Sequence, residues 1–214
     1  MIFDRKFVKF IESFVTPEDK VLQDFVNGNL SLIKYPEMIS GHLQGKILEF
    51  LSVMINPTNI LEIGTYVGYS AIALSKGLKK EGRLDTIERD TSLKNIIHNA
   101  INLTNNADKI FVHFGDFFDV YDSINLKHDL VYIDGDKNEY IDYFNKIFIN
   151  VNPGKYILVD NLFWGEKAFD PLSNKDDVET TGIKMFISFI RDFKGISKIL
   201  LPIRDGLLII RKDD

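Results

Sequence analysis

From residue 60 onward, short runs rich in β-branched and aromatic residues alternate with longer runs that carry apolar residues at helical spacing. The strands are expected at residues 60–63, 83–87, 110–114, 130–133, 156–159, 196–201 and 207–210. Between the first five of these strands, helical patterns lie at residues 70–78, 91–104 and 140–149, with a shorter connection at 117–123. Strands joined by helical crossovers form a parallel sheet that is covered by helices on both faces. The alternation therefore predicts a doubly wound, Rossmann-like α/β fold.

The last two expected strands are connected in a different way. Residues 202–206 alone separate them, and five residues are too few for a helical crossover. These strands should therefore form an antiparallel hairpin at one edge of the sheet. The expected sheet has seven strands and is mostly parallel.

The region before the first strand has a helical pattern. Thr16 is expected to cap a helix whose first position is Pro17. Residues 41–53 carry an apolar stripe at helical spacing, formed by Leu43, Ile47, Leu48 and Leu51. These N-terminal helices can cover one end of the sheet, form a lid or form a dimer surface, and the sequence leaves the three alternatives open.

The length and composition are those of an ordinary globular domain. The chain has 214 residues, of which 45% are hydrophobic and 27% are charged. We expect one domain over residues 1–214, in which residues 1–55 form a helical extension packed on a core at residues 56–214. No apolar run approaches eighteen residues, and the charged N-terminus lacks the features of a secretory signal. We therefore expect a cytoplasmic protein that does not span a membrane.

Cysteine content and net charge exclude or disfavour several kinds of site. The sequence contains no cysteine, which excludes a disulfide scaffold, a thiolate metal site and a cysteine nucleophile. The formal net charge of −5 argues against broad binding to nucleic acid, for which a basic surface is expected.

A turn that contains two glycines, LEIGTYVGYS at residues 61–70, leads from the first strand into a helix. Glycine lets a ligand approach the backbone closely and permits positive φ. The spacing differs from the G-x-G-x-x-G of dinucleotide sites, and a carboxylate at Glu62 would repel a pyrophosphate. That carboxylate suits a ligand with an ammonium and a sulfonium group, so the turn favours S-adenosylmethionine over NAD or ATP. The expected contacts within the turn are Glu62, Gly64, Thr65, Gly68 and Ser70; a plain strand-to-helix turn is the alternative.

Further candidate cofactor residues follow the second and third strands. Glu88, at the tip of the second strand, can accept hydrogen bonds from both ribose hydroxyls of a nucleoside. After the third strand, Asp116 can accept a hydrogen bond from the exocyclic amine of adenine, and Phe117 can stack on the ring. A solvated strand end and an ordinary loop aspartate are the alternatives for the two acids. Together with the glycine turn, these residues predict a site for a nucleoside-containing cofactor.

Oxygen-bearing side chains end the fourth and fifth strands. Asp134 follows the fourth strand, and Asp160 and Asn161 follow the fifth. Carboxyl ends of neighbouring parallel strands meet at one edge of the sheet, where ligands bind in open α/β folds. Two carboxylates and an amide oxygen suit Mg²⁺, with Mn²⁺ or Ca²⁺ as alternatives. The other interpretation is that these residues only cap turns.

Lys137 and Trp164 lie close in sequence to the candidate metal ligands. A divalent cation disfavours a neighbouring ammonium group, so it would lower the pKa of Lys137 and make a neutral amine base available. A solvent-exposed lysine is the alternative. Trp164 can form the wall of an aromatic pocket or cover the edge of the core.

Taken together, these motifs resemble the cation-dependent class I O-methyltransferases, which include the catechol and caffeoyl-CoA O-methyltransferases and their small bacterial relatives. The segments that carry the resemblance are Met38-Ile39-Ser40, LEIGTYVGYS at 61–70, TIERD at 86–90, YIDGDKNEY at 132–140, DNLFWGE at 160–166 and LPIRDGLLIIRK at 201–212. The resemblance extends from about Met38 to the C-terminus. Residues 1–37 match less clearly, and in this family that region helps to shape the acceptor pocket and the dimer.

The resemblance implies an enzyme that uses S-adenosylmethionine and a Mg²⁺-type ion, and it implies a homodimer. The ion would be held at the positions of Asp134, Asp160 and Asn161. The implied cofactor contacts are Ser40, Glu62, Gly64, Ser70, Glu88 and Phe117, with Asp134 close by. Phe117 departs from the family pattern, which commonly has alanine there. Lys137 matches the catalytic base beside Asp134, and the residues expected near the acceptor are Met38, Trp164 and Asp205.

Three classes of acceptor are compatible with this chemistry. A small catechol-like phenol suits chelation of a metal by two adjacent oxygens and suits an acidic protein. A CoA thioester would need cations for its phosphates, for which Arg5, Lys6 and Lys9 are weak candidates. A 5-hydroxyuridine in tRNA also presents adjacent oxygens, and the net charge makes it the second choice. A binding protein without catalysis would not need the combined set of metal ligands and base.

Overall fold

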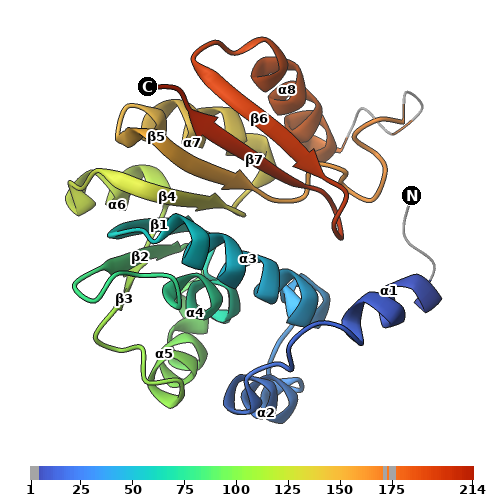
Figure 1. The fold of residues 1–214 in the computed structure, drawn as a ribbon, viewed down its shortest axis with the longest axis vertical. Coiled ribbons are helices and arrows are strands. Elements are labelled where there is room, and N and C mark those ends of the chain that lie inside the picture. Colours follow the sequence, from blue (N-terminus) through green and yellow to red (C-terminus); the bar gives the residue numbers. More distant parts are fainter. Residues whose placement is uncertain (1–4, 171–172, 174–176) are drawn as a thin grey trace.

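The computed structural model describes residues 5–170, 173 and 177–214 of the chain. At its centre is a seven-stranded sheet in the order β3-β2-β1-β4-β5-β7-β6 (Figure 1). The strands are β1 (Asn59–Ile63), β2 (Arg83–Glu88), β3 (Ile110–Phe114), β4 (His128–Ile133), β5 (Val151–Val159), β6 (Ile196–Leu201) and β7 (Leu207–Lys212). The helices are α1 (Arg5–Glu12), α2 (Lys20–Asn29), α3 (Gly41–Ile55), α4 (Tyr69–Ser75), α5 (Lys94–Leu103), α6 (Phe117–Ile124), α7 (Tyr140–Phe148) and α8 (Val178–Asp192). Short 3₁₀ turns are η1 (Pro36–Met38), η2 (Thr91–Leu93) and η3 (Lys137–Glu139).

The pairing of the strands confirms the predicted α/β fold. Strands β1 to β5 pair in parallel, whereas β7 pairs antiparallel with both β5 and β6. The last two strands therefore form the expected antiparallel hairpin, with β7 inserted between β5 and the edge strand β6. Ile133 of β4 pairs with Val159 of β5, so the residues that follow these two strands meet at one edge.

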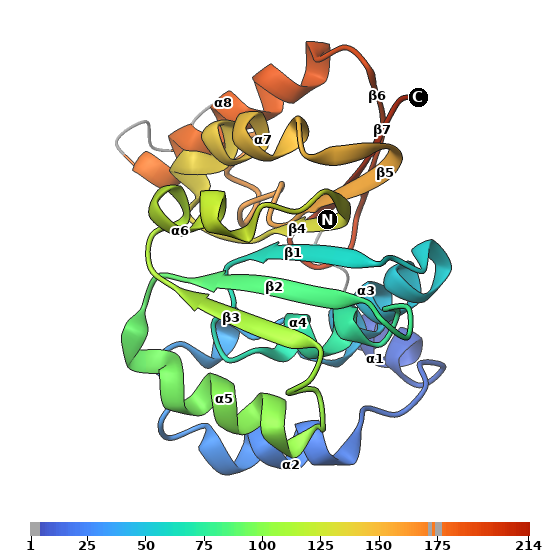
Figure 2. The same cartoon turned by 90° about the vertical axis from the view of Figure 1, so that its left-hand side faces the viewer.

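Alternate residues of the strands face two separate hydrophobic cores. Ile60 and Leu130 belong to the core that is covered by α2, α3, α4 and α5. Their neighbours Leu61 and Val131 belong to the core that is covered by α6, α7 and α8. Figure 2 shows the two groups of helices on opposite sides of the strands. Burial on both faces explains why the central strands are almost continuously apolar.

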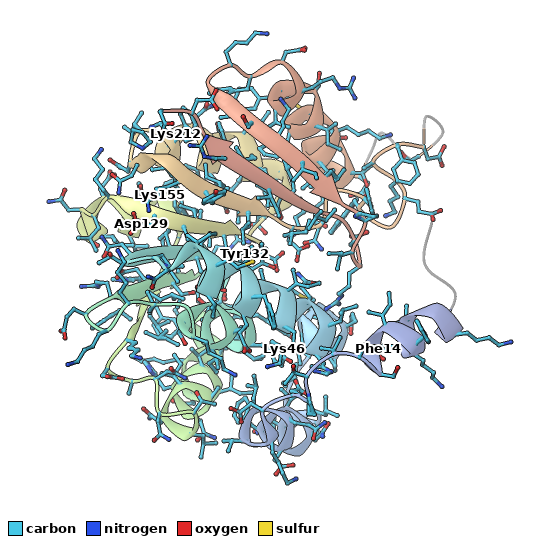
Figure 3. All side chains as sticks on the ribbon, in the orientation of Figure 1. Phe14, Lys46, Asp129, Tyr132, Lys155 and Lys212 are labelled. Carbon is cyan, nitrogen blue, oxygen red and sulfur yellow. The ribbon has the colours of Figure 1, made fainter. Side chains whose placement is uncertain are left out.

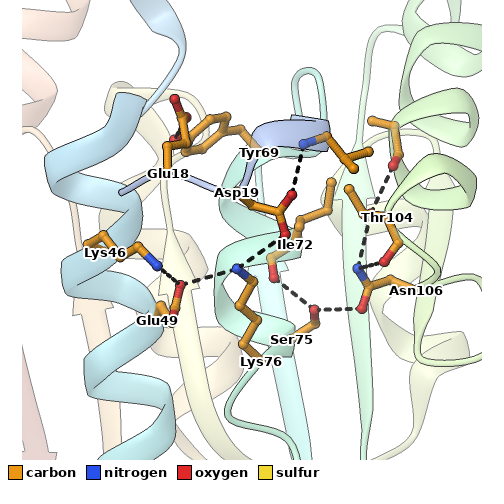
Figure 4. Close-up of polar contacts among 12 residues, drawn as sticks. Glu18, Asp19, Lys46, Glu49, Tyr69, Ile72, Ser75, Lys76, Thr104 and Asn106 are labelled. Atoms are coloured by element: carbon orange, nitrogen blue, oxygen red, sulfur yellow. Dashed lines mark hydrogen bonds and ion pairs between the residues drawn. The ribbon is translucent and has the colours of Figure 1, made fainter. Parts of the chain in front are cut away.

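The predicted helix start at Thr16 is wrong. Helix α2 begins at Lys20, and the carboxylate of Asp19 caps it by accepting a hydrogen bond from the backbone N–H of Val21 at 2.9 Å. Residues 16–19, which precede α2, instead contact α3 and α4; the contact to α3 is between His42 Nε2 and the backbone oxygen of Thr16. The Tyr69 hydroxyl donates to the Glu18 carboxylate, and Asp19 also faces Lys76 (Figure 4). These side-chain contacts hold residues 16–19 in a non-helical conformation ahead of an effective Asp cap.

One strand begins earlier than expected, and one helix was not expected from the sequence. Strand β5 begins at Val151, five residues before the expected start, and includes Pro153 and Gly154. Helix α8 had no counterpart among the expected elements. It is capped by Asp177 and buries Ile183, Phe186 and Ile190 against the sheet.

The N-terminal helix α1 projects from the rest of the molecule (Figure 1). Phe10, in the last turn of α1, and Phe14, just beyond the helix, form an edge-to-face pair. The two residues are 61% and 77% exposed. Over the described residues, no helix has both the length and the apolar composition that a membrane span requires.

Candidate active site

A cavity of about 560 Å³ opens at the carboxyl ends of β1, β2, β4 and β5. Most of the predicted site residues line it, namely Met38, Ser40, Gly64, Glu88, Asp116, Phe117, Asp134, Lys137, Asp160, Asn161, Trp164 and Asp205. The fold thus brings residues from distant parts of the sequence to one place. The other predicted cofactor residues, Glu62, Thr65, Gly68 and Ser70, are not among the lining residues, although all but Gly68 are buried polar side chains of the same turn.

The glycine turn requires glycine at its first position for two reasons. Gly64 has a φ of +97°, which L side chains rarely adopt. A Cβ atom at this position would lie 2.4 Å from the backbone oxygen of Asp134. Gly64 therefore allows the end of β1 to lie directly against the loop that follows β4. Gly68, with a φ of +83°, is the N-cap residue directly before α4.

Glu62 is fully buried behind the turn. Its Oε2 accepts a hydrogen bond of 2.5 Å from the Thr86 hydroxyl, which is also 2.5 Å from the hydroxyl of Thr65. Its Oε1 has no hydrogen-bond partner among the described residues. Burial raises the pKa of Glu62 to about 8, although the hydrogen bond from Thr86 opposes this rise. An unsatisfied buried carboxylate oxygen next to a glycine turn is suited to a ligand that brings a hydrogen-bond donor.

Glu88 ends β2 with both carboxylate oxygens turned to the backbone. Oε2 accepts from the N–H of Tyr66 at 2.7 Å, and Oε1 accepts from the N–H of Asp90 at 2.7 Å. Burial raises the pKa of Glu88 while these N–H groups lower it. Each oxygen retains acceptor capacity, because a carboxylate oxygen has two lone pairs. The side chain is thus held in place with room for two further donors.

Asp116 and Phe117 are both at the start of α6. Asp116 caps this helix through a 2.9 Å hydrogen bond from the N–H of Phe118 to its Oδ1. Phe117 is buried and stacks on Tyr121, with ring centroids 4.9 Å apart, and it also contacts Tyr143 edge-on. The bulky Phe117 is therefore part of the core as well as of the cavity wall.

Asp134 and Lys137 form an ion pair in which the lysine is buried and the carboxylate is partly buried. Lys137 Nζ donates to Asp134 Oδ1 at 2.9 Å and to the backbone oxygen of Gly135 at 2.9 Å. Burial would lower the pKa of Lys137, but the Asp134 carboxylate outweighs it and raises that pKa above its usual range. Burial raises the pKa of Asp134 to about 6, although Lys137 opposes the rise. Lys137 therefore remains a protonated ammonium group as long as no other cation neutralises the negative charge of Asp134.

Asp160 is a buried carboxylate with several donors around it. Its Oδ2 accepts a hydrogen bond from the hydroxyl of Tyr132 at 2.8 Å and another from the amide of Gln44. Its Oδ1 accepts from the backbone N–H of Asn161 at 2.8 Å. Asn161 has a φ of +63°, a conformation that asparagine tolerates better than most residues.

The candidate metal ligands have the chemistry of a hard-cation site. Asp134 and Asp160 follow paired strands, and the charge of Asp160 contributes to the raised pKa of Asp134. Two neighbouring carboxylates, one buried and one partly buried, whose charges repel one another are stabilised by a cation between them. The described residues contain no cluster of three or more His, Cys, Asp or Glu side chains that would hold a metal. The predicted set contains only two residues of these types, because its third member is the amide of Asn161, and such a set fits an ion that keeps water ligands.

The lining of the cavity also contains Trp164, Asp205 and Arg204. The Trp164 ring lies 5.9 Å from Lys137 Nζ, and its buried Nε1 has no partner among the described residues. Asp205 Oδ1 accepts from the N–H of Gly165 at 2.7 Å, and burial raises the pKa of Asp205. Arg204 donates to the backbone oxygen of Ile39 at 2.9 Å, which ties the β6–β7 hairpin to the segment that carries Met38 and Ser40.

Sequence reasoning missed several residues that line this cavity, and Gln44 and Arg204 are two of them. Gln44 had a detectable signal, because it is a polar residue on the buried face of α3. That face is formed by Gln44, Gly45, Leu48 and Ser52, whereas Leu43, Ile47 and Leu51 of the expected stripe are only partly buried. Arg204 has no local signal, since its contact to Ile39 joins segments 165 residues apart.

Comparison with known proteins identifies the family. The family model described as O-methyltransferase matches residues 12–213. This chain belongs to the O-methyltransferase family. The predicted family and enzyme class are therefore confirmed, and the family match includes the strands and loops that form the cavity.

Individual relatives agree with this O-methyltransferase assignment. A catechol O-methyltransferase of Niastella koreensis is 29% identical over 174 residues, which are 79% of this chain and 78% of the relative. Caffeoyl-CoA O-methyltransferase 1 of Arabidopsis thaliana is 25% identical and shares 79% of this chain and 69% of its own length. The crystal structure of an O-methyltransferase from Bacillus cereus in complex with SAH is 28% identical, with a TM-score of 0.86 over 95% of this chain and 96% of that one.

Proposed function

We propose that this O-methyltransferase transfers the methyl group of S-adenosylmethionine to a hydroxyl of a small phenol with adjacent oxygens, in a reaction that depends on a divalent cation. The observation that carries the proposal is the placement of Asp134 and Asp160 in the same cavity as Glu88 and the glycine turn. A metal site and a nucleoside site that share one cavity suit a methyl donor and a chelated acceptor. Mg²⁺ is the proposed ion, with Mn²⁺ or Ca²⁺ as alternatives.

Three features support S-adenosylmethionine as the methyl donor. Glu88 is fixed by two backbone N–H groups and retains acceptor capacity for two ribose hydroxyls. The Oε1 of Glu62, which has no partner among the described residues, suits the ammonium group of the donor. The structurally similar Bacillus cereus enzyme is described with SAH, the product of methyl transfer from S-adenosylmethionine.

Asp134, Asp160 and Asn161 are the residues that would hold the ion. When bound there, a divalent cation would bind the acceptor oxygens and lower the pKa of the reacting hydroxyl. The Nζ atom of Lys137 lies 2.9 Å from Asp134 Oδ1, and Lys137 is the one lysine among the described residues that line the cavity. Because Asp134 raises the pKa of Lys137, the lysine can lose its proton only when the charge of that carboxylate is compensated. Lys137 would then remove the hydroxyl proton, and the cavity would align the oxygen with the methyl group.

The charges of the cavity favour a small phenol over the other acceptors. The lining includes nine acidic side chains, Glu37, Glu88, Asp90, Asp116, Asp134, Asp136, Asp160, Glu179 and Asp205. It includes three basic ones, and each is already engaged: Arg89 with Asp136, Lys137 with Asp134 and Arg204 with backbone oxygens. Such a wall repels the phosphates of a CoA thioester or of tRNA. Of the cations suggested for a CoA thioester, the side chain of Arg5 lies outside the described residues.

We also propose that the protein is a homodimer whose second copy covers α1. The support is that α1 projects from the domain and exposes the Phe10–Phe14 pair. Light scattering should give twice the monomer mass for the wild type and a smaller mass for a Phe10→Ser/Phe14→Ser variant. A monomeric wild type would overturn this proposal.

One acceptor screen tests the proposed reaction. Labelled S-adenosylmethionine and Mg²⁺ are incubated with the enzyme and with catechol, a catechol-bearing CoA thioester or tRNA that lacks the methyl group. We expect label in catechol and little in the other two acceptors. Transfer to tRNA or to the CoA thioester alone would overturn the proposed acceptor class, and transfer to none of a broad set of phenols would argue against the proposed chemistry.

A further inference from the structure

Gln44 links the N-terminal helices to the end of β5. Its side chain is only 3% exposed. Its Nε2 donates to the hydroxyl of Tyr132 at 3.0 Å and also to Oδ2 of Asp160. The Tyr132 hydroxyl in turn donates to the same Oδ2 at 2.8 Å. Figure 3 places Tyr132 near the middle of the molecule, by α3, so this triangle lies between α3 and the sheet.

The chemistry of the three groups fixes the direction of every bond in the triangle. An ionised carboxylate only accepts hydrogen bonds, so the NH₂ group of Gln44 must face Asp160. Both lone pairs of Oδ2 are then used by Gln44 and Tyr132. In the described part of the chain, Oδ1 accepts one bond, from the N–H of Asn161. The remaining lone pair of the carboxylate is therefore on Oδ1.

We propose that Gln44 is a positioning residue for the divalent-cation site. By holding Oδ2, it fixes the rotation of the Asp160 carboxylate and leaves Oδ1 as the oxygen that coordinates the ion. This inference rests on the proposed function, because it takes Asp160 as a metal ligand. Helix α3, which precedes the sheet in the sequence, then has a role beyond packing. Through Gln44 it sets the orientation of Asp160, the metal-coordinating residue at the end of β5.

Partners that orient a metal ligand change affinity for the metal when they are removed. Loss of such a partner typically weakens metal binding by about 10–100-fold. A residue that only satisfies buried polar groups would instead lower stability and leave metal affinity unchanged. Metal affinity and stability must therefore be measured on the same variants.

The test is Mn²⁺ binding, followed by the electron paramagnetic resonance signal of the free ion. Gln44→Met removes both donors at nearly constant length, and Gln44→Asn withdraws the amide by one methylene group as a second, polar variant. Ser52→Ala is the matched control, because Ser52 is a buried polar residue of α3 whose hydroxyl donates to the backbone oxygen of Leu74, away from the cavity. Asp160→Ala defines the loss of a ligand. SAH affinity reports whether each variant retains its fold.

We expect both Gln44 variants to bind Mn²⁺ about 10–100-fold more weakly, with SAH affinity unchanged. The Mn²⁺ concentration for half-maximal methyl transfer should rise equally, with kcat restored at saturating Mn²⁺. Ser52→Ala should bind Mn²⁺ like the wild type. Unchanged Mn²⁺ affinity in the Gln44 variants, together with its loss in Asp160→Ala, would overturn the role of Gln44 and leave the proposed function intact. A wild type that binds Mn²⁺ no better than Asp160→Ala would overturn both.

Discussion

Gly64 and Asp134 touch through their backbones at the point where the cofactor turn meets the candidate metal loop. A Cβ atom on Gly64 would lie 2.4 Å from the backbone oxygen of Asp134 and 2.8 Å from its carbonyl carbon. The two sites are thus joined by a contact that tolerates no side chain. A change at Gly64 has to displace the metal loop, the turn or both.

Gly64→Ala should therefore destabilise the protein more than an alanine at a glycine with the same backbone strain but open surroundings. Gly195 is the matched control, since its φ is +76° and no atom lies within 4 Å of its would-be Cβ. Both substitutions incur the left-handed penalty of about 1–2 kcal/mol. We expect Gly64→Ala to lose about 1–3 kcal/mol more in urea unfolding, because of overpacking. Equal losses at the two positions would contradict the close contact.

Glu88 should contribute directly to binding of the methyl donor. We expect Glu88→Ala to weaken SAH binding by about 1–3 kcal/mol, because hydrogen bonds to the ligand are lost and the N–H groups of Tyr66 and Asp90 are left without their partner. Glu81→Ala, at an exposed carboxylate near the opposite end of β2, is the control. Calorimetry of both variants gives the comparison. Unchanged affinity in a folded Glu88→Ala protein would remove this residue from the site.

The succession of strands and helices along the chain could be predicted from the sequence because it depends on local periodicity, and the edge that holds the site follows from parallel pairing of the strands. Asp134 and Asp160 each follow an apolar run, and parallel strands bring their ends together regardless of other details. The glycine turn was also predictable, because its two glycines directly follow the first strand in the sequence. The family resemblance alone suggested roles for Ser40 and Asp205, which periodicity does not reveal.

Contacts between distant segments could not be predicted in the same way. Asp19 caps α2 in place of Thr16 because Glu18 is held by Tyr69, a residue 51 positions away. Arg204 reaches Ile39 across the cavity for a similar, non-local reason. Helix α8 is different, since Asp177 and the spacing of Ile183, Phe186 and Ile190 provide a local signal.

His128 should make stability depend on pH. It is almost fully buried, and burial lowers its pKa to about 4 from an ordinary value near 6.5. The unfolded chain therefore binds a proton more readily, so the contribution of neutral His128 is complete above pH 6.5 and is lost as the pH falls from 6.5 towards 4. The full loss corresponds to about 3 kcal/mol at 1.36 kcal/mol per pKa unit.

The contribution of His128 to the pH dependence of stability is measured by comparing variants across that pH range. Unfolding free energies of the wild type and His128→Gln are measured from pH 7 to pH 4, and the exposed His98→Gln serves as the control. We expect a shallower slope only in His128→Gln. Identical slopes in all three proteins would show that His128 is not held neutral by burial.

Lys137 tests the mechanism independently of the cofactor. Lys137→Ala should lower the rate of methyl transfer by about 10²–10⁴-fold, the usual contribution of a positioned acid–base group. The loss should shrink for acceptors with an acidic hydroxyl, such as nitrocatechols. Lys146→Ala, at a lysine that pairs with Asp122 away from the cavity, is the control. A variant with nearly full rate on every acceptor would exclude Lys137 as the base.

Methyl transfer by this enzyme is proposed to require a divalent cation held by Asp134, Asp160 and Asn161. The most direct measurement is the rate of transfer from labelled S-adenosylmethionine to catechol, in excess EDTA and then with Mg²⁺ added back, for the wild type and Asp160→Ala. We expect no transfer in EDTA, recovery of the wild type with Mg²⁺ and little recovery of Asp160→Ala, because a hard cation loses much of its site when one carboxylate is removed. Full transfer by the wild type in excess EDTA would contradict the proposal.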